Sequence, residues 1–220
     1  MSIKNRLYDL LYGDEVISKT ILPILNGLGS PLLIGGAIRS AAIESYMGFS
    51  YEKPRDLDFV IYESDLDNFV KVMKRLGAKT NRYGGYSIDF KGWKCDVFRL
   101  EDTWARTQGL VSINEAQDFI KAPFFSCDQI AFDINKDKVY TSSQYFSNLR
   151  KRILHVNILA TLNAEAQLIR AIRYKIKYDF TFGHPLKEFV KSNLLKFGLD
   201  RIIETEKRNF NVPLIQVGDC

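Results

Sequence analysis

Asp56 and Asp58 are the residues whose types and spacing most clearly indicate a reactive or metal-binding site. One residue, Leu57, separates them at the start of an apolar segment that ends at Tyr62. Alternate residues of a β-strand point to the same face, so the carboxylates should project side by side with Cα atoms roughly 6.5 to 7 Å apart. Such a pair repels unless cations or hydrogen bonds compensate. Hard oxygen ligands select Mg²⁺ or Mn²⁺ over zinc, and paired carboxylates can bridge two such ions. The alternative is a solvated strand end.

A glycine pair, Gly35 and Gly36, separates a short apolar run over 31–34 from a predicted helix over 37–47. Glycines let a phosphate approach backbone N–H groups, and a helix N-terminus favours an anion. Arg39 lies in the first turn of that helix, from which a guanidinium can reach a phosphate oxygen. The pattern predicts a triphosphate site, with an ordinary strand-to-helix turn as the alternative.

A third acid, Asp96, lies inside the mostly apolar segment 93–100, between Cys95 and Val97. A carboxylate in the middle of a strand is disfavoured unless a cation pairs with it. This position therefore predicts that Asp96 faces a metal ion or an arginine.

The elements that must position these residues follow from the periodicity of the apolar side chains. We expect helices over 15–28, 37–47, 66–76, 164–178, 185–197 and 200–207, and strands over 31–34, 56–62, 86–90, 93–100, 124–134 and 139–141. Strands and helices both occur up to about residue 155, and only helices follow. The chain is therefore predicted to be an α+β protein with two parts, residues 1–155 and a helical part over 156–220.

The composition excludes several classes of protein. The 220 residues are 46% hydrophobic and 26% charged, which is typical of a globular protein and not of a disordered or fibrous one. No apolar run approaches the ~18 to 20 residues that span a bilayer, and the first residues lack the apolar region of a secretory signal. We therefore expect a cytoplasmic protein with no membrane partner. The 2 histidines and 3 cysteines, without a CxxC pair, argue against a multi-histidine, zinc or disulfide framework.

Positive charge is concentrated near the C-terminus. The whole chain has 31 basic and 26 acidic residues, a net +5, whereas residues 148–220 have 13 basic and 7 acidic residues, a net +6. Arg170, Arg173 and Lys177 share one face of the predicted helix 164–178, because they are spaced three and four residues apart. This asymmetry predicts contact with a polyanion, with a solvated amphipathic helix as the alternative.

Taken together, these motifs resemble those of the DNA polymerase beta-type nucleotidyltransferases, and more narrowly the head and neck of bacterial poly(A) polymerases and class II CCA-adding tRNA nucleotidyltransferases. The resemblance spans roughly residues 30 to 180. It is carried by the order and spacing of LIGGAIR at 33–39, RDLDFV at 55–60, DVFR at 96–99, FSCDQIAFD at 125–133 and LIRAIRY at 168–174.

The resemblance implies a nucleotidyltransferase-fold mixed sheet flanked by helices, followed by a short C-terminal helical neck. It implies that a nucleoside monophosphate passes from an NTP, such as ATP, to an acceptor hydroxyl with release of pyrophosphate. The implied acceptor is an RNA 3′ end, as in tRNA processing, and the implied cofactor is a pair of Mg²⁺ ions. The implied residues are Asp56, Asp58 and Asp96 for catalysis and metal binding, Gly35, Gly36, Arg39, Arg170 and Arg173 for the nucleotide, and Arg170, Arg173 and Lys177 for RNA.

Several positions depart from the family pattern. Ser40 replaces an aspartate, Lys121-Ala122-Pro123 replaces an RRD triplet, and Ala164 and Gln167 occupy the positions that read the incoming base. Strict CTP-then-ATP addition is therefore not expected. A small-molecule or protein acceptor, and a catalytically silent nucleotide- or RNA-binding relative, are the alternatives. Only about 40 residues follow the neck-like helix, and the sequence leaves open a homo-oligomer or a partner subunit that completes the RNA clamp.

Overall fold

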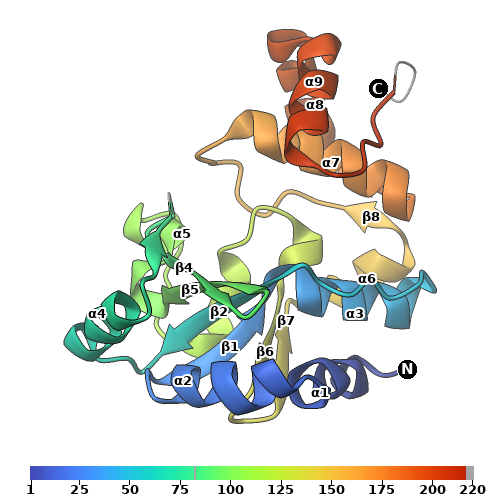
Figure 1. The fold of residues 1–220 in the computed structure, drawn as a ribbon. Coiled ribbons are helices and arrows are strands. Elements are labelled where there is room, and N and C mark those ends of the chain that lie inside the picture. The colour runs from blue at the N-terminus through green and yellow to red at the C-terminus, as the bar shows by residue number, and fades with distance from the viewer. Residues whose placement is uncertain (82, 217–220) are drawn as a thin grey trace. The chain divides into compact units, whose positions relative to one another are not determined.

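The chain forms an α+β fold with two compact units (Figure 1). The computed structural model describes residues 1–81 and 83–216. The first unit comprises Met1–Pro123 and Asp128–Tyr145, and the second comprises Phe124–Cys127 and Phe146–Cys220. The short segment Phe124–Cys127 thus groups with C-terminal residues although first-unit residues flank it on both sides. This division differs from the predicted one at residue 155, which lies inside the second unit.

A mixed sheet forms the centre of the first unit. Its order in the described residues is β3-β4-β5-β2-β1-β6-β7. The strands are β1 (Ser30–Ile34), β2 (Asp56–Tyr62), β3 (Lys79–Thr80), β4 (Tyr86–Phe90), β5 (Trp93–Arg99), β6 (Ile130–Asp133) and β7 (Lys138–Thr141). β2 and β5 run parallel, and the other neighbouring pairs are antiparallel. The mixed sheet and its flanking helices confirm the predicted fold class.

Helices of the first unit follow the predicted pattern with informative exceptions. They are α1 (Ile3–Gly13), a π-helix (Ile17–Ile21), α2 (Leu22–Asn26), α3 (Gly35–Met47), α4 (Leu66–Arg75), α5 (Trp104–Thr107) and the 3-10 turns Leu100–Asp102 and Ala116–Lys121. The predicted helix over 15–28 contains a π-helical turn at Ile17–Ile21 that passes directly into α2, whose first turn holds Pro23, a residue with no N–H to donate within a helix. Asp65 caps α4 by accepting from the Asn68 N–H at 2.7 Å.

The predicted strand over 124–134 is wrong in its first half. Only Ile130–Asp133 is a strand, and Ser126–Asp128 is a 3-10 turn. Phe125 forms an isolated bridge with Val156 instead of joining the sheet. The apolar run thus reflects burial of Phe124 and Phe125 and not a continuous strand.

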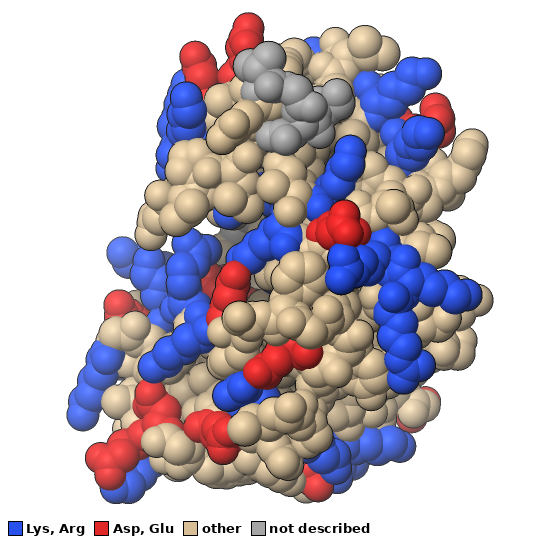
Figure 2. All heavy atoms as spheres, turned by 90° about the vertical axis from the view of Figure 1, so that its right-hand side faces the viewer, with Lys and Arg blue, Asp and Glu red and all other residues tan. Residues whose placement is uncertain are grey.

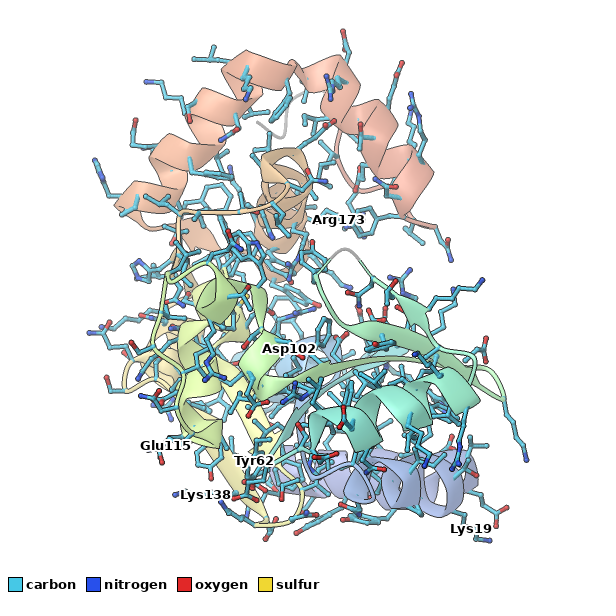
Figure 3. All side chains as sticks on the ribbon, turned by 90° about the vertical axis from the view of Figure 1, so that its left-hand side faces the viewer. Lys19, Tyr62, Asp102, Glu115, Lys138 and Arg173 are labelled. Carbon is cyan, nitrogen blue, oxygen red and sulfur yellow. The ribbon has the colours of Figure 1, made fainter. Side chains whose placement is uncertain are left out.

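Alternation along β1 and β2 gives the sheet two buried faces. Leu57, Phe59 and Ile61 are fully buried on one face. Side chains of the other face form an apolar cluster, whose buried members include Leu32, Ile34, Val60, Tyr62, Leu100, Ile113 and Phe119. On this face the Tyr62 hydroxyl donates to the buried Asp133 carboxylate at 2.8 Å. Figure 3 labels Tyr62. Asp56 and Asp58 precede Val60 by even numbers of residues, so they project on the face of this cluster.

The second unit is mainly helical. It contains most of α6 (Tyr145–Arg150) and all of α7 (Ala164–Tyr178), α8 (His184–Phe197) and α9 (Leu199–Asn209), with β8 (Ile153–Leu154) parallel to β9 (Thr181–Phe182). Asn163 caps α7 by accepting from the Ala166 N–H at 2.9 Å. Leu168, Ile172 and Leu186 are buried in its core. Within residues 1–81 and 83–216, none of the helices combines the length and apolar character needed to cross a bilayer.

Candidate active site

The strand register places two of the predicted acids, Asp58 and Asp96, side by side across the sheet, with Asp56 two residues before Asp58 on the same strand. Parallel pairing of β2 with β5 aligns Asp58 with Asp96, and antiparallel pairing of β1 with β2 aligns Ile34 with Asp58. Residues aligned on neighbouring strands project to the same face, and neighbouring strands lie about 4.8 Å apart. Asp58 and Asp96 are half-buried, and Asp56 is exposed. The three acids therefore share one sheet face, and two of them come from adjacent strands.

Gly35 lets the Asp58 carboxylate lie against the start of α3. Its backbone has a φ of +71°, and a Cβ atom at this position would overlap the Asp58 carboxylate. Gly36 differs, since a Cβ there would make only an ordinary contact with the Arg39 guanidinium at 3.6 Å. The first glycine is thus required by both its backbone angle and the carboxylate above it, whereas the second is not sterically required.

Arg39 forms an ion pair with Asp128. The two side chains are only 17% and 10% exposed, so the pair is shielded from solvent. Asp128 lies in the 3-10 turn before β6, far from Arg39 in the sequence. The guanidinium that was predicted to reach a phosphate therefore has an acidic partner within the first unit, and Asp128 is a site residue that the sequence reasoning did not identify.

Ser87 is a second residue that the sequence reasoning missed. It lies opposite Asp96 in the β4–β5 hairpin, and its hydroxyl donates a hydrogen bond to Asp96 Oδ1. A signal for it was present, because the turn at Lys91 and Gly92 pairs Phe90 with Trp93 and thereby fixes the register of the hairpin. The hydroxyl orients the third carboxylate of the row.

Cys95, which directly precedes Asp96 in β5, is not part of this chemistry. Its side chain points to the opposite face from Asp96 and is 1% exposed. Burial, with a smaller contribution from Asp58 and Asp96, raises the pKa of its thiol to about 12. A thiol with this pKa stays protonated at neutral pH and is therefore unreactive.

The chemistry of the donor set fits Mg²⁺ or Mn²⁺. Asp56, Asp58 and Asp96 provide only carboxylate oxygens, which these ions prefer. Among the described residues, no group of three His, Cys, Asp or Glu side chains is arranged as a preformed metal site. The Asp58 carboxylate instead lies against Gly35, and that of Asp96 accepts from Ser87.

The predicted basic residues of α7 belong to the second unit, where Arg170 packs on aromatic rings. Its guanidinium carbon lies 5.3 Å from the Phe125 ring centroid and 5.6 Å from that of Tyr174. It also donates to the Tyr174 hydroxyl at 2.9 Å and to Gln167 at 3.2 Å. Lys177 is half-buried, with Nζ 5.3 Å from the centroid of the Tyr178 ring.

Arg173 connects α7 to the C-terminal segment. Arg173, labelled in Figure 3, forms an ion pair with Glu206, whose side chain is fully buried. It also donates to the Val212 carbonyl at 2.9 Å. Its guanidinium also lies 4.0 Å from the centroid of the Phe210 ring. Glu206 further accepts from the Leu214 and Ile215 N–H groups, each at 2.9 Å. These contacts give Arg173 a structural role within the second unit.

Comparison with known proteins supports the fold. No family model matches the chain, and no curated protein matches its sequence. Solved structures do match. An apo CCA-adding enzyme has 17% identity over 88% of this chain and 48% of the other, with a TM-score of 0.55. The Thermotoga maritima CCA-adding enzyme complexed with tRNA has 18% identity over 85% of this chain and 45% of the other, with a TM-score of 0.54.

A third solved structure is a tRNA nucleotidyltransferase complexed with a primer tRNA and an incoming ATP analogue. It is 15% identical over 86% of this chain and 54% of the other, with a TM-score of 0.54. The chain thus spans about half the length of the structures it matches. At these identities the likeness shows a shared fold, that of the CCA-adding enzymes, in agreement with the resemblance found in the sequence motifs.

Proposed function

We propose that this chain is a metal-dependent nucleotidyltransferase that transfers a nucleoside monophosphate from an NTP to the 3′-hydroxyl of an RNA, with pyrophosphate as the leaving group. The observation that carries the proposal is the row of Asp58 and Asp96 on adjacent strands beside Gly35 at the start of α3. In the shared fold, this arrangement places carboxylates next to a helix N-terminus that suits a triphosphate.

The residues of the first unit have distinct roles in this proposal. Asp56, Asp58 and Asp96 would hold Mg²⁺, which, when bound, lowers the pKa of the acceptor hydroxyl and neutralises the triphosphate. The N-terminus of α3 offers backbone N–H groups and a favourable dipole to the phosphates. Arg39, paired with Asp128, acts as a positioning residue that fixes the first turn of α3.

RNA is the acceptor that the observations favour. Two of the similar solved structures are described as complexes with tRNA. The C-terminal residues 148–220 also carry a net charge of +6, which suits a polyanion. We therefore propose a tRNA-like 3′ end as the acceptor. An enzyme that acts on such an RNA would work in the cytoplasm.

The proposal is tested by incubating the protein with Mg²⁺, unprocessed tRNA transcripts and each labelled NTP separately. The wild type should transfer label to RNA. The Asp56→Asn/Asp58→Asn variant should lose at least about 10²-fold in rate, because it retains the shape of the side chains and removes their charge. Asp67→Asn, an exposed aspartate of α4, is the matched control and should be as active as the wild type.

Three outcomes would contradict the proposal. Label that appears only on a small molecule or on protein would overturn RNA as the acceptor. An unchanged rate in the Asp56→Asn/Asp58→Asn variant would overturn the site itself. Omission of Mg²⁺ with excess chelator should abolish transfer, and transfer that persists would exclude the metal-dependent mechanism.

A further inference from the structure

Basic side chains gather where α6 leads into β8 and where α7 ends. They are Arg150, Lys151, Arg152, Lys175 and Lys177, which we call the β8 basic surface. Pairing of β8 with β9 brings the two segments together, and Arg152 joins them directly, since its carbonyl accepts from the Thr181 N–H at 2.8 Å. Figure 2 faces the side on which Figure 1 labels β8 and shows Lys and Arg side chains gathered there.

This surface accounts for most of the excess positive charge of the C-terminal third. In the sequence, the segments 150–152 and 175–182 hold these five cations and one acid, Asp179, so they contribute a net +4 of the +6 carried by residues 148–220. Asp179 pairs with Arg152 at 2.6 Å, but the two side chains are 79% and 43% exposed. An ion pair this exposed is weak, so Arg152 can exchange Asp179 for a more highly charged anion such as a phosphate.

The surface shares only Lys177 with the basic stripe predicted on α7. Arg170 and Arg173 of that stripe contact aromatic rings and the buried Glu206 within the second unit. Lys151 and Lys175 are instead exposed to solvent. The exposed cations that an external polyanion can reach therefore lie near the C-terminal end of α7 and near β8, and not in the middle of α7.

We propose that the β8 basic surface binds the phosphate backbone of the acceptor RNA. The identity of the RNA as acceptor rests on the proposed function, whereas the surface itself rests on charge and exposure. A membrane surface is less suitable, because anchoring to lipid requires exposed apolar side chains beside the cations. Here the neighbouring Tyr178 and Phe180 are buried, and Phe182 is half-buried.

The test measures binding of a tRNA transcript to the full chain by fluorescence anisotropy at several salt concentrations. Lys151→Ala/Lys175→Ala should weaken binding on the order of tenfold and lower the slope of log affinity against log salt by roughly 1.5, since each lost phosphate contact removes about 0.7 to 0.9. Lys191→Ala/Lys196→Ala, which removes two exposed lysines of α8, is the matched control and should bind as the wild type.

The outcomes separate this proposal from the proposed function. If the wild type transfers no nucleotide but the Lys151→Ala/Lys175→Ala variant still loses RNA affinity, the surface stands and the nucleotidyltransferase proposal fails. If transfer occurs but this variant binds RNA like its control, the surface proposal is overturned. Binding to vesicles of phosphatidylserine and phosphatidylcholine, lost in the variant while RNA affinity is unchanged, also overturns it. Equal melting temperatures of both variants verify that they are folded.

Discussion

Asp58 and Asp96 are held in their row by two small residues that act in opposite ways. Gly35 orients Asp58 by having no side chain, since a Cβ atom would occupy the space of the carboxylate. Ser87 orients Asp96 by contributing a hydroxyl that donates to Oδ1. Both arrangements fix a carboxylate without adding a competing charge. In the nucleotidyl transfer proposed above, positioning supplies much of the rate, so both small residues should affect turnover.

Removal of the Ser87 hydroxyl tests this at the residue scale. We expect Ser87→Ala to lower kcat about tenfold with little change in KM for the NTP, because a misplaced Asp96 affects the reacting atoms more than substrate binding. Ser87→Thr retains the hydroxyl and should keep most of the activity. Steady-state kinetics on both variants check the prediction, and an equal loss in both would show that the hydrogen bond is not the cause.

At the scale of elements, α1 acts as a brace for the helix that begins at Gly35. Arg6 of α1 forms a two-pronged contact with Glu44 of α3, in which its Nε donates to Glu44 Oε2 at 2.8 Å. The Arg6 guanidinium also lies 4.5 Å from the centroid of the Tyr51 ring. The two charged side chains are 24% and 18% exposed, so this pair is better shielded than an ordinary surface pair.

The brace predicts a pH dependence of stability. The hydrogen bond from Arg6 lowers the pKa of Glu44 below its ordinary value of 4.5. A carboxylate with a lowered folded-state pKa stabilises the fold above its unfolded-state pKa and loses this contribution as the pH falls through the folded-state value. Glu44→Gln should therefore reduce the free energy of unfolding by about 1 to 2 kcal/mol at pH 7.

Urea unfolding at pH 7 and pH 3.5 measures this difference, which should shrink at the lower pH. Glu15→Gln serves as the control, because Glu15 pairs with Lys19 in a contact whose side chains are 81% and 70% exposed. That substitution should change the stability by less than about 0.5 kcal/mol. A Glu44→Gln difference that is the same at both pH values would show that packing, and not charge, connects α1 to α3.

The sequence predicted elements best where local signals were strong. β2 and α7 have the predicted bounds. The acid–apolar alternation at 56–59, continued by an apolar run to Tyr62, indicates the strand, and an Asn163 cap with helical periodicity indicates the helix. α1 was not predicted, although the spacing of Ile3, Leu7, Leu10 and Leu11 suffices to indicate it. Of the predicted strand over 124–134 only Ile130–Asp133 is a strand, because apolar residues such as Phe124 and Phe125 indicate burial and do not fix conformation.

The candidate site was predictable only in part, for reasons of sequence distance. Spacing within a strand indicated Asp56 and Asp58, and a turn beside a helix indicated Gly35. The partner of Arg39 could not be inferred, because Asp128 lies 89 residues away. Glu206 likewise lies 33 residues from Arg173. Helical spacing shows which side chains share a face of the helix. It does not show which of them form ion pairs or ring contacts with distant parts of the chain.

At the scale of the whole molecule, the Arg173–Glu206 pair should stabilise the second unit. Arg173→Ala would leave the buried Glu206 charge without its ion-pair partner, at a cost of about 3 to 5 kcal/mol. Thermal unfolding of the full chain should show a large decrease in Tm, and adding Glu206→Gln should recover part of it. Lys177→Ala, on the same helix, should change Tm little. An unchanged Tm with weaker NTP binding would instead support the nucleotide-binding role first predicted for Arg173.

The segment Phe124–Cys127 has a consequence for how this protein can be divided. Because it groups with the second unit, the chain passes between units after Pro123, after Cys127 and again after Tyr145. Phe125 of this segment is fully buried, with its ring 5.4 Å from that of Tyr174. A fragment ending at residue 145 would retain this phenylalanine and lose its packing partner. Neither unit is therefore one continuous segment that can be cut out and moved to another protein. A chimaera that exchanges one unit must keep the chain crossing between the units at all three junctions.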